Sequence, residues 1–424
     1  MKYVIVGYSV AAVNAITAIR ESDKTGEITV ISNEDRLYSR PLISYYLAGK
    51  LSKDKIGFTS TDFEKDMGVK VLYNTEAVKI ETKSRHVEIN NKKKLPYDRL
   101  LICSGGTPIK IPVDGLKDNL SGVFTFTKLA DAKEIEKYIE KNKVKEAVIL
   151  GGGLIGMKAA EALLGKKMKF KILDIADRLL ANTFDREASA IIEEKLKENG
   201  CEFLKETTIK KVVSKAGKIE ELVLSNGKKL KAKLLIMAVG VRPEVSLAKG
   251  TPIAVNRGIV VDARMETNVP GVFSAGDCAE GLEFLSGKGA VIAIWPTAAK
   301  QGKVAGHNMS GAKDVFGGSF AMNSVEILGV PSISFGITNP KEDGYEVVKK
   351  SGEGKYKKIV VKDNRLVGVI LVNCIERAGI YGLLIKEKLD VLALKKELLT
   401  DDFGFLLLPT DFRKHFVTGE GTEV

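Results

Sequence analysis

Hydrophobic residues in the first 110 positions fall into short runs separated by stretches with helical spacing. Residues 2–7 form an apolar run that predicts a buried parallel strand, and alanine and isoleucine recur at helical spacing over residues 10–21. Residues 27–31 form the next apolar run, so this segment predicts a βαβ unit of about 30 residues. Shorter runs predict further strands near residues 69–73, 76–81 and 85–89.

The same pattern returns in the middle of the chain. Residues 147–174 predict a second βαβ unit, which follows a charged amphipathic helix at residues 131–142. A helix at residues 185–199 ends at Gly200, a residue type that suits the end of a helix. Strands are expected after it near residues 202–205, 209–214, 219–224 and 234–238.

The pattern changes in the last hundred residues. A helix is expected from near Thr297 past Gly306, and the adjacent glycines Gly317 and Gly318 interrupt the chain after it. Short apolar runs separated by turns then predict strands near residues 325–328, 333–337, 356–361 and 366–373. These elements predict an α/β protein that ends in an α+β domain.

A complete glycine loop lies between the strand and the helix of the second βαβ unit. Gly151, Gly153 and Gly156 have the spacing that permits a tight turn, close approach of the backbone to a pyrophosphate, and packing of the helix on the strand. Asp174 ends the following strand, 18 residues after Gly156. A carboxylate there accepts hydrogen bonds from a ribose and repels a 2′-phosphate, which favours NADH over NADPH.

An imperfect version of this loop opens the chain. Gly7 follows the first strand, but Ser9 and Ala12 occupy the positions of the second and third glycines. Alanine is tolerated at the third position, and a serine hydroxyl can donate to a phosphate. Glu34, just after the second strand, is the expected ribose partner, with Asn33 as the alternative.

The two loops predict two Rossmann-like, three-layer ββα dinucleotide-binding domains. The two prolines Pro108 and Pro112 mark a boundary, and the turn at residues 239–243 is typical of a return to the first domain. The predicted bounds are residues 1–110 with 241–315 for the first domain, 111–240 for the second, and 316–424 for the C-terminal domain with its tail.

Composition limits the function classes. The chain has 424 residues, with 44% hydrophobic and 28% charged residues, which is ordinary for a globular protein. No apolar run approaches the roughly 18 residues of a membrane span, and the first strand starts at Lys2 in place of a signal peptide. We therefore expect a cytoplasmic protein with no membrane partner. The net charge of +12 leaves open an acidic partner, a nucleic acid or only a lysine-rich surface.

Cysteine and histidine spacing argues against a metal site. The cysteines are widely separated and form no CxxC pair, and the histidines form no cluster. We therefore expect neither a bound metal nor an adjacent redox dithiol. The residues concerned are Cys103, Cys201, Cys278, Cys374, His86, His307 and His415.

Several segments together resemble the FAD-dependent pyridine nucleotide oxidoreductases. The first βαβ unit, the Ser-Gly-Gly-Thr-Pro turn at 104–108, the complete second loop, and residues 239–243 and 272–277 occur in this order in that family. The resemblance covers about residues 1–310. The branch of NADH:rubredoxin reductases and assimilatory nitrite reductase flavin domains is similar at residues 38–44, 293–302 and 375–379.

The resemblance implies two cofactors and two sets of binding residues. Asp277 would bind the ribityl chain of FAD, and the segment before residue 302 would approach the isoalloxazine. The implied FAD residues are Gly7, Ser9, Ala12, Glu34, Arg40, Pro41, Ser104, Gly105, Asp277, Trp295 and Pro296. The implied NADH residues are Gly151, Gly153, Leu154, Ile155, Gly156, Asp174 and Gly240.

The chain departs from its relatives at one pair of positions. Many ferredoxin-reductase relatives place a lysine and a glutamate where this chain has Tyr45 and Lys158. Tyr45 is a candidate to cover the flavin edge. Lys158 either stabilises negative charge near the flavin or faces solvent, and Glu161 is its expected partner at i, i+3.

A second departure concerns the electron acceptor. Relatives that reduce disulfides use a cysteine close to the flavin, but residues 1–102 contain no cysteine. Cys103 and Cys278 are interpreted as small buried hydrophobic residues. The leading hypothesis is an NADH-dependent reductase of an acidic iron–sulfur carrier, similar to rubredoxin or ferredoxin, acting alone, as a homodimer or as a subunit of a larger complex. The alternatives are an NADH oxidase that uses oxygen and, less favoured, a redox-switched basic flavoprotein that binds nucleic acid.

Overall fold

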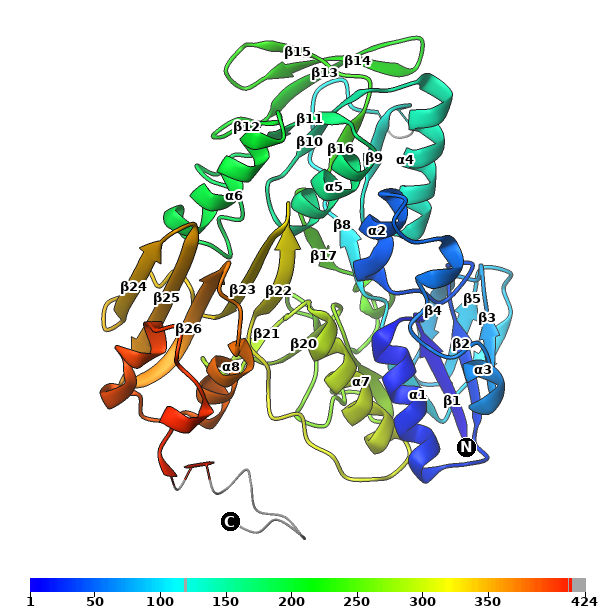
Figure 1. Cartoon of the computed structure of the whole chain (residues 1–424). Helices are drawn as coiled ribbons and strands as arrows, with labels where there is room; N and C mark the ends of the chain where they lie inside the picture. Colours follow the sequence, from blue (N-terminus) through cyan, green and yellow to red (C-terminus); the bar gives the residue numbers. More distant parts are fainter. Residues whose placement is uncertain (118–119, 411, 414–424) are drawn as a thin grey trace. The chain divides into compact units, whose positions relative to one another are not determined.

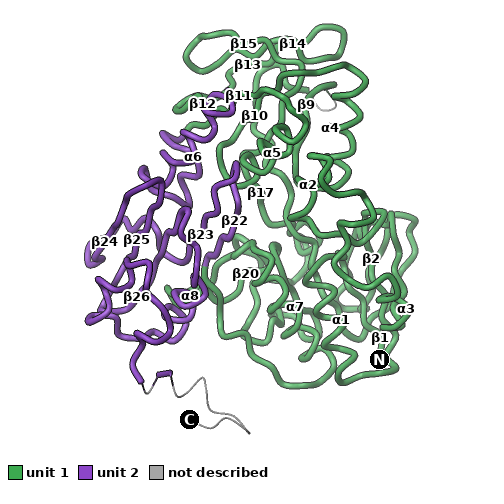
Figure 2. The backbone as a smooth tube through the Cα atoms, viewed as in Figure 1, with its two compact units in different colours: residues 1–175, 204–320 green, residues 176–203, 321–424 purple. Residues whose placement is uncertain are grey.

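The structure is a computed structural model that describes residues 1–117, 120–410 and 412–413. The chain forms two compact units, residues 1–175 with 204–320 and residues 176–203 with 321–424 (Figure 2). The fold class is the predicted one, an α/β protein with Rossmann-like parallel sheets and an α+β C-terminal part (Figure 1). The three-domain bounds expected from the sequence stay a prediction beside this division.

The first parallel sheet of unit 1 has the strand order β19-β7-β1-β2-β3. Alternate residues along its strands point to opposite faces, as the geometry of a strand requires. Tyr3 and Ile5 pack with helices α1 and α7, whereas Val4 and Val6 pack with the small sheet β4-β5-β6. The sheet is therefore buried between a helical layer and a β layer, which confirms the ββα layering. The bounds are β1 Lys2–Val6, β2 Glu27–Ile31, β3 Val69–Leu72, β4 Ala77–Glu81, β5 His86–Ile89, β6 Lys94–Pro96, β7 Arg99–Ile102, β19 Val272–Ser274, α1 Val10–Ser22 and α7 Trp295–Met309.

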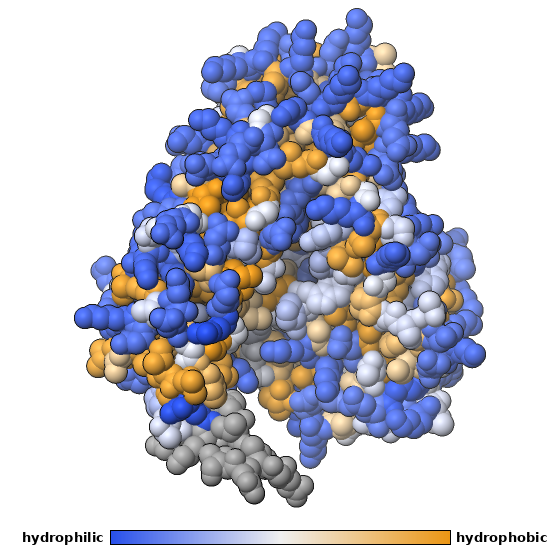
Figure 3. Space-filling view, viewed as in Figure 1, coloured by the Kyte–Doolittle hydropathy of each residue, from blue (hydrophilic) through white to orange (hydrophobic). Residues whose placement is uncertain are grey.

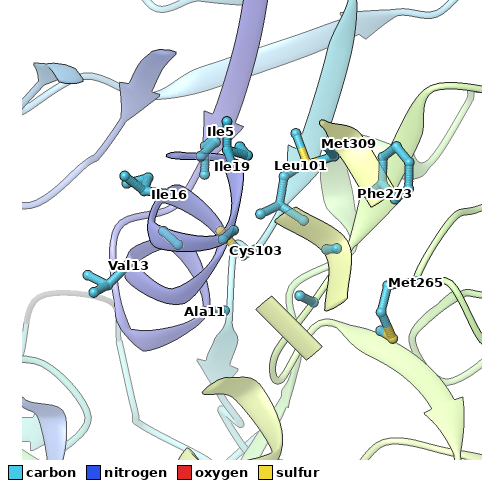
Figure 4. Packing of buried hydrophobic residues seen from close by; sticks show 14 of the residues in the cluster. Ile5, Ala11, Val13, Ile16, Ile19, Leu101, Cys103, Met265, Phe273 and Met309 are labelled. Carbon is cyan, nitrogen blue, oxygen red and sulfur yellow. The ribbon is translucent and has the colours of Figure 1, made fainter. Parts of the chain in front are cut away.

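Helices α1 and α7 cross closely over this sheet. A Cβ atom on Gly302 would lie 2.1 Å from the carbonyl oxygen of Ala11, and one on Gly306 would lie 2.3 Å from that of Ala15. Figure 4 shows the apolar side chains of the cluster at this crossing. The close approach also lets Gln301 accept a hydrogen bond from the backbone N–H of Gly276 at 2.9 Å, which fixes the loop before Asp277.

A histidine joins the C-terminal ends of the same two helices. The two ring nitrogens of His307 lie 2.7 Å from Asp314 Oδ2 and 2.8 Å from Glu21 Oε2. Burial opposes protonation of this ring, but the two carboxylates outweigh it and raise the pKa of His307 above its ordinary 6.5. When protonated, the His307 ring therefore forms ion pairs that connect α1, α7 and the loop after α7.

The second parallel sheet of unit 1 contains the strands β11-β10-β16-β9 in that order. Its apolar residues pack with the antiparallel sheet β13-β14-β15, and α5 begins directly after β10. Two short strands, β8 and β17, pair antiparallel where the chain passes between the two sheets of unit 1. The bounds are β8 Gly106–Pro108, β9 Val123–Thr125, β10 Glu146–Leu150, β11 Lys169–Leu173, β12 Glu202–Leu204, β13 Ile209–Lys215, β14 Lys218–Leu224, β15 Lys229–Lys231, β16 Leu235–Met237, β17 Val241–Pro243, α4 Leu129–Asn142 and α5 Leu154–Gly165.

Shorter elements complete unit 1. They are α2 Ile43–Leu47, α3 Phe63–Asp66, β18 Ile259–Val260, β20 Ala279–Leu282 and β21 Gly289–Ala290, with 3-10 turns at Arg40–Leu42, Lys53–Lys55 and Ser246–Ala248. Helix α2 packs against both α4 and α5. The segment after residue 40 is therefore held beside the helix that follows the second glycine loop.

Unit 2 is built on an antiparallel sheet with the order β22-β23-β26-β25-β24. Helix α6 belongs to this unit because Asp185, its N-cap, accepts hydrogen bonds from Tyr356 and, at 3.0 Å, from Lys358 of β25. Both Asp185 and Lys358 are buried, so this is an ion pair within the unit. The bounds are α6 Arg186–Glu198, β22 Met322–Ile327, β23 Val330–Gly336, β24 Glu346–Gly352, β25 Lys355–Lys362, β26 Arg365–Val372 and α8 Ala378–Glu387, with 3-10 turns at Leu392–Leu394, Glu397–Leu399 and Phe405–Leu407.

Two elements of unit 2 have no counterpart among the strands and helices expected from sequence. Strand β24 is an edge strand whose residues are almost all exposed, so it lacks the alternation of apolar and polar residues that predicts a strand. Helix α8 contains Gly379 and Gly382, which lower helix propensity. Most of the predicted tail after Phe403 lies outside the described residues.

Candidate functional site

The first glycine loop has a backbone that admits no other residue at its first position. Gly7 adopts a φ of +99°, and a Cβ there would lie 2.1 Å from the carbonyl oxygen of Cys103 on the neighbouring strand. Ser9 caps α1 without a side-chain hydrogen bond within the described chain, so its hydroxyl is not committed to the helix. The loop presents its backbone and the N-terminus of α1 to a pocket, as anion binding requires.

This pocket has a volume of about 380 Å³ and collects residues from widely separated parts of unit 1. Its walls include the first glycine loop, the Ser104–Gly106 turn and the start of α7, together with the first turns of α5. The predicted site residues that line it are Gly7, Ser9, Glu34, Arg40, Pro41, Ser104, Gly105, Leu154, Ile155, Lys158, Asp277 and Trp295. Ala12 is instead buried in the core with α1, and Pro296 and Tyr45 are not among the lining residues.

A charged cluster forms one part of the pocket wall. Arg40 donates to Glu34 at 2.6 Å and to the carbonyl oxygen of Thr127 at 3.0 Å. Burial raises the pKa of Asp277, and the charge of Arg40 partly offsets this. The arrangement places a carboxylate where the sequence predicts a ribose partner, and a cation between two carboxyl groups.

Another part of the wall is aromatic and apolar, with one polar atom that lacks a partner. Trp295 packs edge-on against Phe58, with ring centroids 5.0 Å apart. Ser44 lines the pocket and is 3% exposed, and its hydroxyl has no hydrogen-bond partner in the part of the chain that the structure describes. Buried hydroxyls are normally hydrogen-bonded, so Ser44 points to a polar ligand atom at this position.

The pocket residues fit the FAD that the sequence resemblance implies. A glycine loop at a helix N-terminus suits a pyrophosphate, Glu34 suits a ribose, and the Trp295 region with the orphaned Ser44 hydroxyl suits a flat ring with polar edges. Sequence reasoning left Ser44 out of the candidate residues, although it lies in the segment 38–44 that carries the resemblance. It also missed Thr127, for which the sequence offers no signal because its contact with Arg40 spans 87 residues.

Like the first loop, the second glycine loop has a positive φ at its first glycine, and it also has a glycine at its third position. Gly151 has a φ of +111°, and a Cβ on Gly156 would lie 1.9 Å from the carbonyl oxygen of Gly151. A Cβ on Gly153, by contrast, would meet no described atom within 4 Å. Protein packing therefore requires Gly156 but not Gly153, which is consistent with a ligand approaching the backbone at Gly153.

Asp174 lies beside this loop. Its Oδ2 accepts a hydrogen bond from the backbone N–H of Gly152 at 2.5 Å, which places the carboxylate at the loop as the sequence predicts for a ribose partner. Gly240, also predicted, has a φ of +112° and accepts a hydrogen bond from Ile109 at 3.0 Å. This contact anchors the turn that precedes β17.

Lys158 connects the two loops. It lies on α5, which starts at the second glycine loop, yet it lines the pocket of the first. Its ammonium group is 2.7 Å from Glu161, the predicted partner, and 6.0 Å from the centre of the Tyr45 ring. The ammonium of Lys50 lies 5.6 Å from the same ring centre, so Tyr45 is flanked by two cations.

The cysteines are buried thiols. All four lie in the described ranges, and each is buried and outside any disulfide. Cys103 lines the pocket, but its thiol donates to the carbonyl oxygen of Gly7 at 3.3 Å, and burial raises the pKa of that thiol well above its ordinary value. A thiol held protonated is a poor nucleophile.

The described residues contain no group of three or more histidine, cysteine or carboxylate residues that could hold a metal ion. Within the same ranges, no helix combines the length and the apolar character needed to cross a bilayer.

The sequence of this chain is similar to those of known proteins. The family model of the pyridine nucleotide-disulphide oxidoreductases matches residues 1–302, and the model of the rubredoxin NAD+ reductase C-terminal domain matches residues 322–389. The chain is 32% identical over 408 residues to an NADH-dependent phenylglyoxylate dehydrogenase subunit epsilon from Aromatoleum evansii, covering 94% of this chain and 95% of the relative.

Other relatives carry different activities in their names. The chain is 30% identical over 324 residues to an NADH oxidase from Methanocaldococcus jannaschii, covering 74% of this chain and 71% of the relative. Among solved structures, an NAD-dependent persulfide reductase from A. fulgidus superimposes with a TM-score of 0.87 at 27% identity, covering 92% of this chain and 78% of the other. The names of these three relatives share NAD or NADH and differ in the activity that they describe.

Proposed function

This chain belongs to the pyridine nucleotide-disulphide oxidoreductase family, and on that premise we propose that it passes electrons from NADH through FAD to an iron–sulfur electron carrier. It is an FAD-dependent NAD(P)H oxidoreductase, so the proposal concerns the acceptor. FAD supplies the ability to accept a hydride and to release the two electrons one at a time. The carrier is a rubredoxin-like or ferredoxin-like protein, or an iron–sulfur partner subunit.

The observation that carries the proposal is the state of the thiols. Reduction of a disulfide or persulfide through the enzyme needs a reactive thiolate beside the flavin. Among the described residues that line the pocket, Cys103 is the one cysteine, and its buried thiol has a raised pKa. With no second redox group beside it, the flavin must pass electrons directly to an outside acceptor.

Residues at and around the two glycine loops would supply binding and orientation. Glu34, Ser44 and Asp277 would hold FAD, and Gly153 and Asp174 would hold NADH. Because α5 starts at the second loop and lines the pocket of the first, it would align a nicotinamide bound at one loop with a flavin bound in the pocket of the other. Positioning of this kind is the main protein contribution to hydride transfer.

Charge and similarity favour an acidic protein partner. The chain carries a net charge of +12, and residues 209–233 contribute half of it, with eight lysines and two glutamates. Hydrophilic residues dominate this part of unit 1 in Figure 3, around β13, β14 and β15. Opposite charge steers a carrier toward its reductase. The match to the rubredoxin NAD+ reductase C-terminal domain and the relative named as a subunit support a carrier that is either separate or part of a complex.

The test uses the full chain loaded with FAD, without oxygen. NADH is expected to bleach the flavin absorbance, and reduced protein is expected to reduce added rubredoxin or ferredoxin. The carrier rate is expected to fall about tenfold or more between low and high salt, because screening removes electrostatic steering. Failure of both carriers to accept electrons from NADH-reduced protein would refute a separate carrier as the acceptor. A rate that does not change with salt would contradict the steering argument alone.

The second candidate is an NADH oxidase, favoured by the similarity to the relative of that name. The two candidates differ in how fast oxygen and the carrier reoxidise the reduced flavin. Stopped-flow mixing of NADH-reduced protein with air-saturated buffer or with carrier measures both rates. We expect the carrier reaction to be the faster one, and faster reoxidation by oxygen would favour the oxidase.

A further inference from the structure

The pocket contains a positive charge that the binding roles above do not use. Among the described lining residues Lys158 is the one lysine, and the other cation, Arg40, is paired with Glu34. The side chain of Lys158 is 25% exposed, so the ammonium group is held at the wall and partly shielded from water. A charge in such a position acts more strongly on a bound ring than one in bulk solvent.

Two neighbours fix this ammonium group. Glu161, on the next turn of α5, lies 2.7 Å from the ammonium group. The centre of the Tyr45 ring, on α2, lies 6.0 Å from it. The Glu161 side chain is 21% exposed, so the ion pair is also partly shielded. The tyrosine limits where the lysine can swing, and the glutamate reduces the field that the lysine exerts on the pocket.

Hydride transfer would add a negative charge to the flavin, and the Lys158 ammonium group can stabilise that charge. A hydride carries one hydrogen nucleus and two electrons from NADH to FAD, which leaves NAD+ and a reduced flavin with one more negative charge. We propose that Lys158 stabilises this negative charge, with Glu161 as the counter-charge that limits the effect, and that the pair thereby sets the reduction potential of the flavin. This inference rests on the proposed function, since it requires FAD in the pocket and NADH as donor.

The proposal predicts opposite shifts for the two members of the pair. Lys158→Met removes the cation and keeps the length of the side chain, so the reduced flavin loses stabilisation. Glu161→Gln leaves the cation and removes its counter-charge, so the reduced flavin gains stabilisation. A pair that served only to stabilise α5 would give no shift of the potential, or shifts of the same sign.

Lys50 offers a matched control. Its ammonium group lies 5.6 Å from the same Tyr45 ring, but Lys50 is exposed and is not among the residues that line the pocket. Lys50→Met therefore makes the same change of charge beside the same tyrosine. Its reduction potential is expected to equal that of the wild type.

The experiment measures the reduction potential of the bound flavin by anaerobic equilibration with a reference dye, for the wild type and each FAD-loaded variant. Lys158→Met is expected to shift the equilibrium about tenfold toward oxidised flavin, which is about 30 mV lower for a two-electron couple. Glu161→Gln is expected to shift it in the opposite direction, and Lys158→Arg, which keeps the charge, is expected to stay near the wild type. If Lys158→Met does not fold, the sign of the Glu161→Gln shift decides.

Two results overturn the inference in different ways. If NADH reduces the wild type and the variants but Lys158→Met and Glu161→Gln have the potential of Lys50→Met, the role of Lys158 is refuted and the proposed function stands. If the wild-type chain does not bind FAD, or NADH does not reduce it, the proposed function fails and the inference fails with it.

Discussion

Replacing Arg40 with methionine is expected to weaken FAD binding. The guanidinium group donates to Glu34 at 2.6 Å and to Thr127 at 3.0 Å, and it partly offsets the raised pKa of Asp277. Without it, two carboxyl groups remain in a pocket that must also accept the negative charges of a pyrophosphate. The substitution therefore raises the electrostatic cost of binding and releases the segment around residue 40.

The size of the loss follows from the exposure of the pair. A hydrogen bond to a charged group contributes about 1.5–3 kcal/mol. The Glu34 side chain is 16% exposed but that of Arg40 is 41% exposed, so solvent screening favours the lower end of this range. A loss of about 1.5–2 kcal/mol corresponds to a dissociation constant about tenfold to thirtyfold higher.

The assay can use the natural fluorescence of the chain. Trp295 is the one tryptophan in the sequence and lines the pocket, so FAD added to FAD-free protein is expected to quench it. Arg36→Met is the control, because Arg36 lies outside the pocket lining and its contacts with Asp35 and Asp54 are long, at 3.8 and 3.7 Å. If Arg40→Met bound FAD as tightly as Arg36→Met, the assigned role of Arg40 would be refuted.

Three further predictions concern stability. Gly302→Ala is expected to cost about 1–3 kcal/mol or more and to lower FAD occupancy, because the new Cβ would lie 2.1 Å from the carbonyl oxygen of Ala11; thermal unfolding and flavin content measure this, and wild-type values for both would contradict it. Lys358→Met is expected to cost about 1.5–3 kcal/mol in urea unfolding, since it removes a charged hydrogen bond to the buried Asp185 carboxylate and leaves the more exposed Lys349, at 3.5 Å, as the remaining cation. The control is Lys195→Met in an exposed pair, which is expected to cost at most about 1 kcal/mol, and equal losses would contradict the argument. The stability difference between the wild type and His307→Gln is expected to be largest below pH 6.5 and to shrink as pH rises through the higher folded-state pKa; a difference that does not change with pH would refute this.

Much of the fold could be predicted from local sequence. The runs at residues 2–7 and 147–174 predicted strands and helices because residues at fixed spacing share one face of an element. The i, i+3 pair of Lys158 and Glu161 was predictable for the same reason and is confirmed at 2.7 Å. Strand β24 was missed because an exposed edge strand buries neither face and so carries no such pattern.

The candidate site could be predicted only in part. The glycine loops were visible because Gly7 and Gly151 have a positive φ, a local backbone conformation that favours glycine. Ser44 and Thr127 were not, because a buried hydroxyl without a partner and a carbonyl that accepts from Arg40 are properties of the assembled pocket. Ala12, at the third loop position, is buried in the core, which fits the packing role of that position.

The sequence by itself determined two βαβ units with their glycine loops, the family resemblance and the lack of a cysteine in residues 1–102, because each depends on residue type and short spacing. The tertiary structure decided what those parts form together. It carried Lys158 from the second loop into the pocket of the first, and it placed helix α6 in one unit with residues 321–424 through a buried ion pair that spans 173 positions. Contacts of that kind depend on how the chain packs, and packing brings together residues that no local pattern connects.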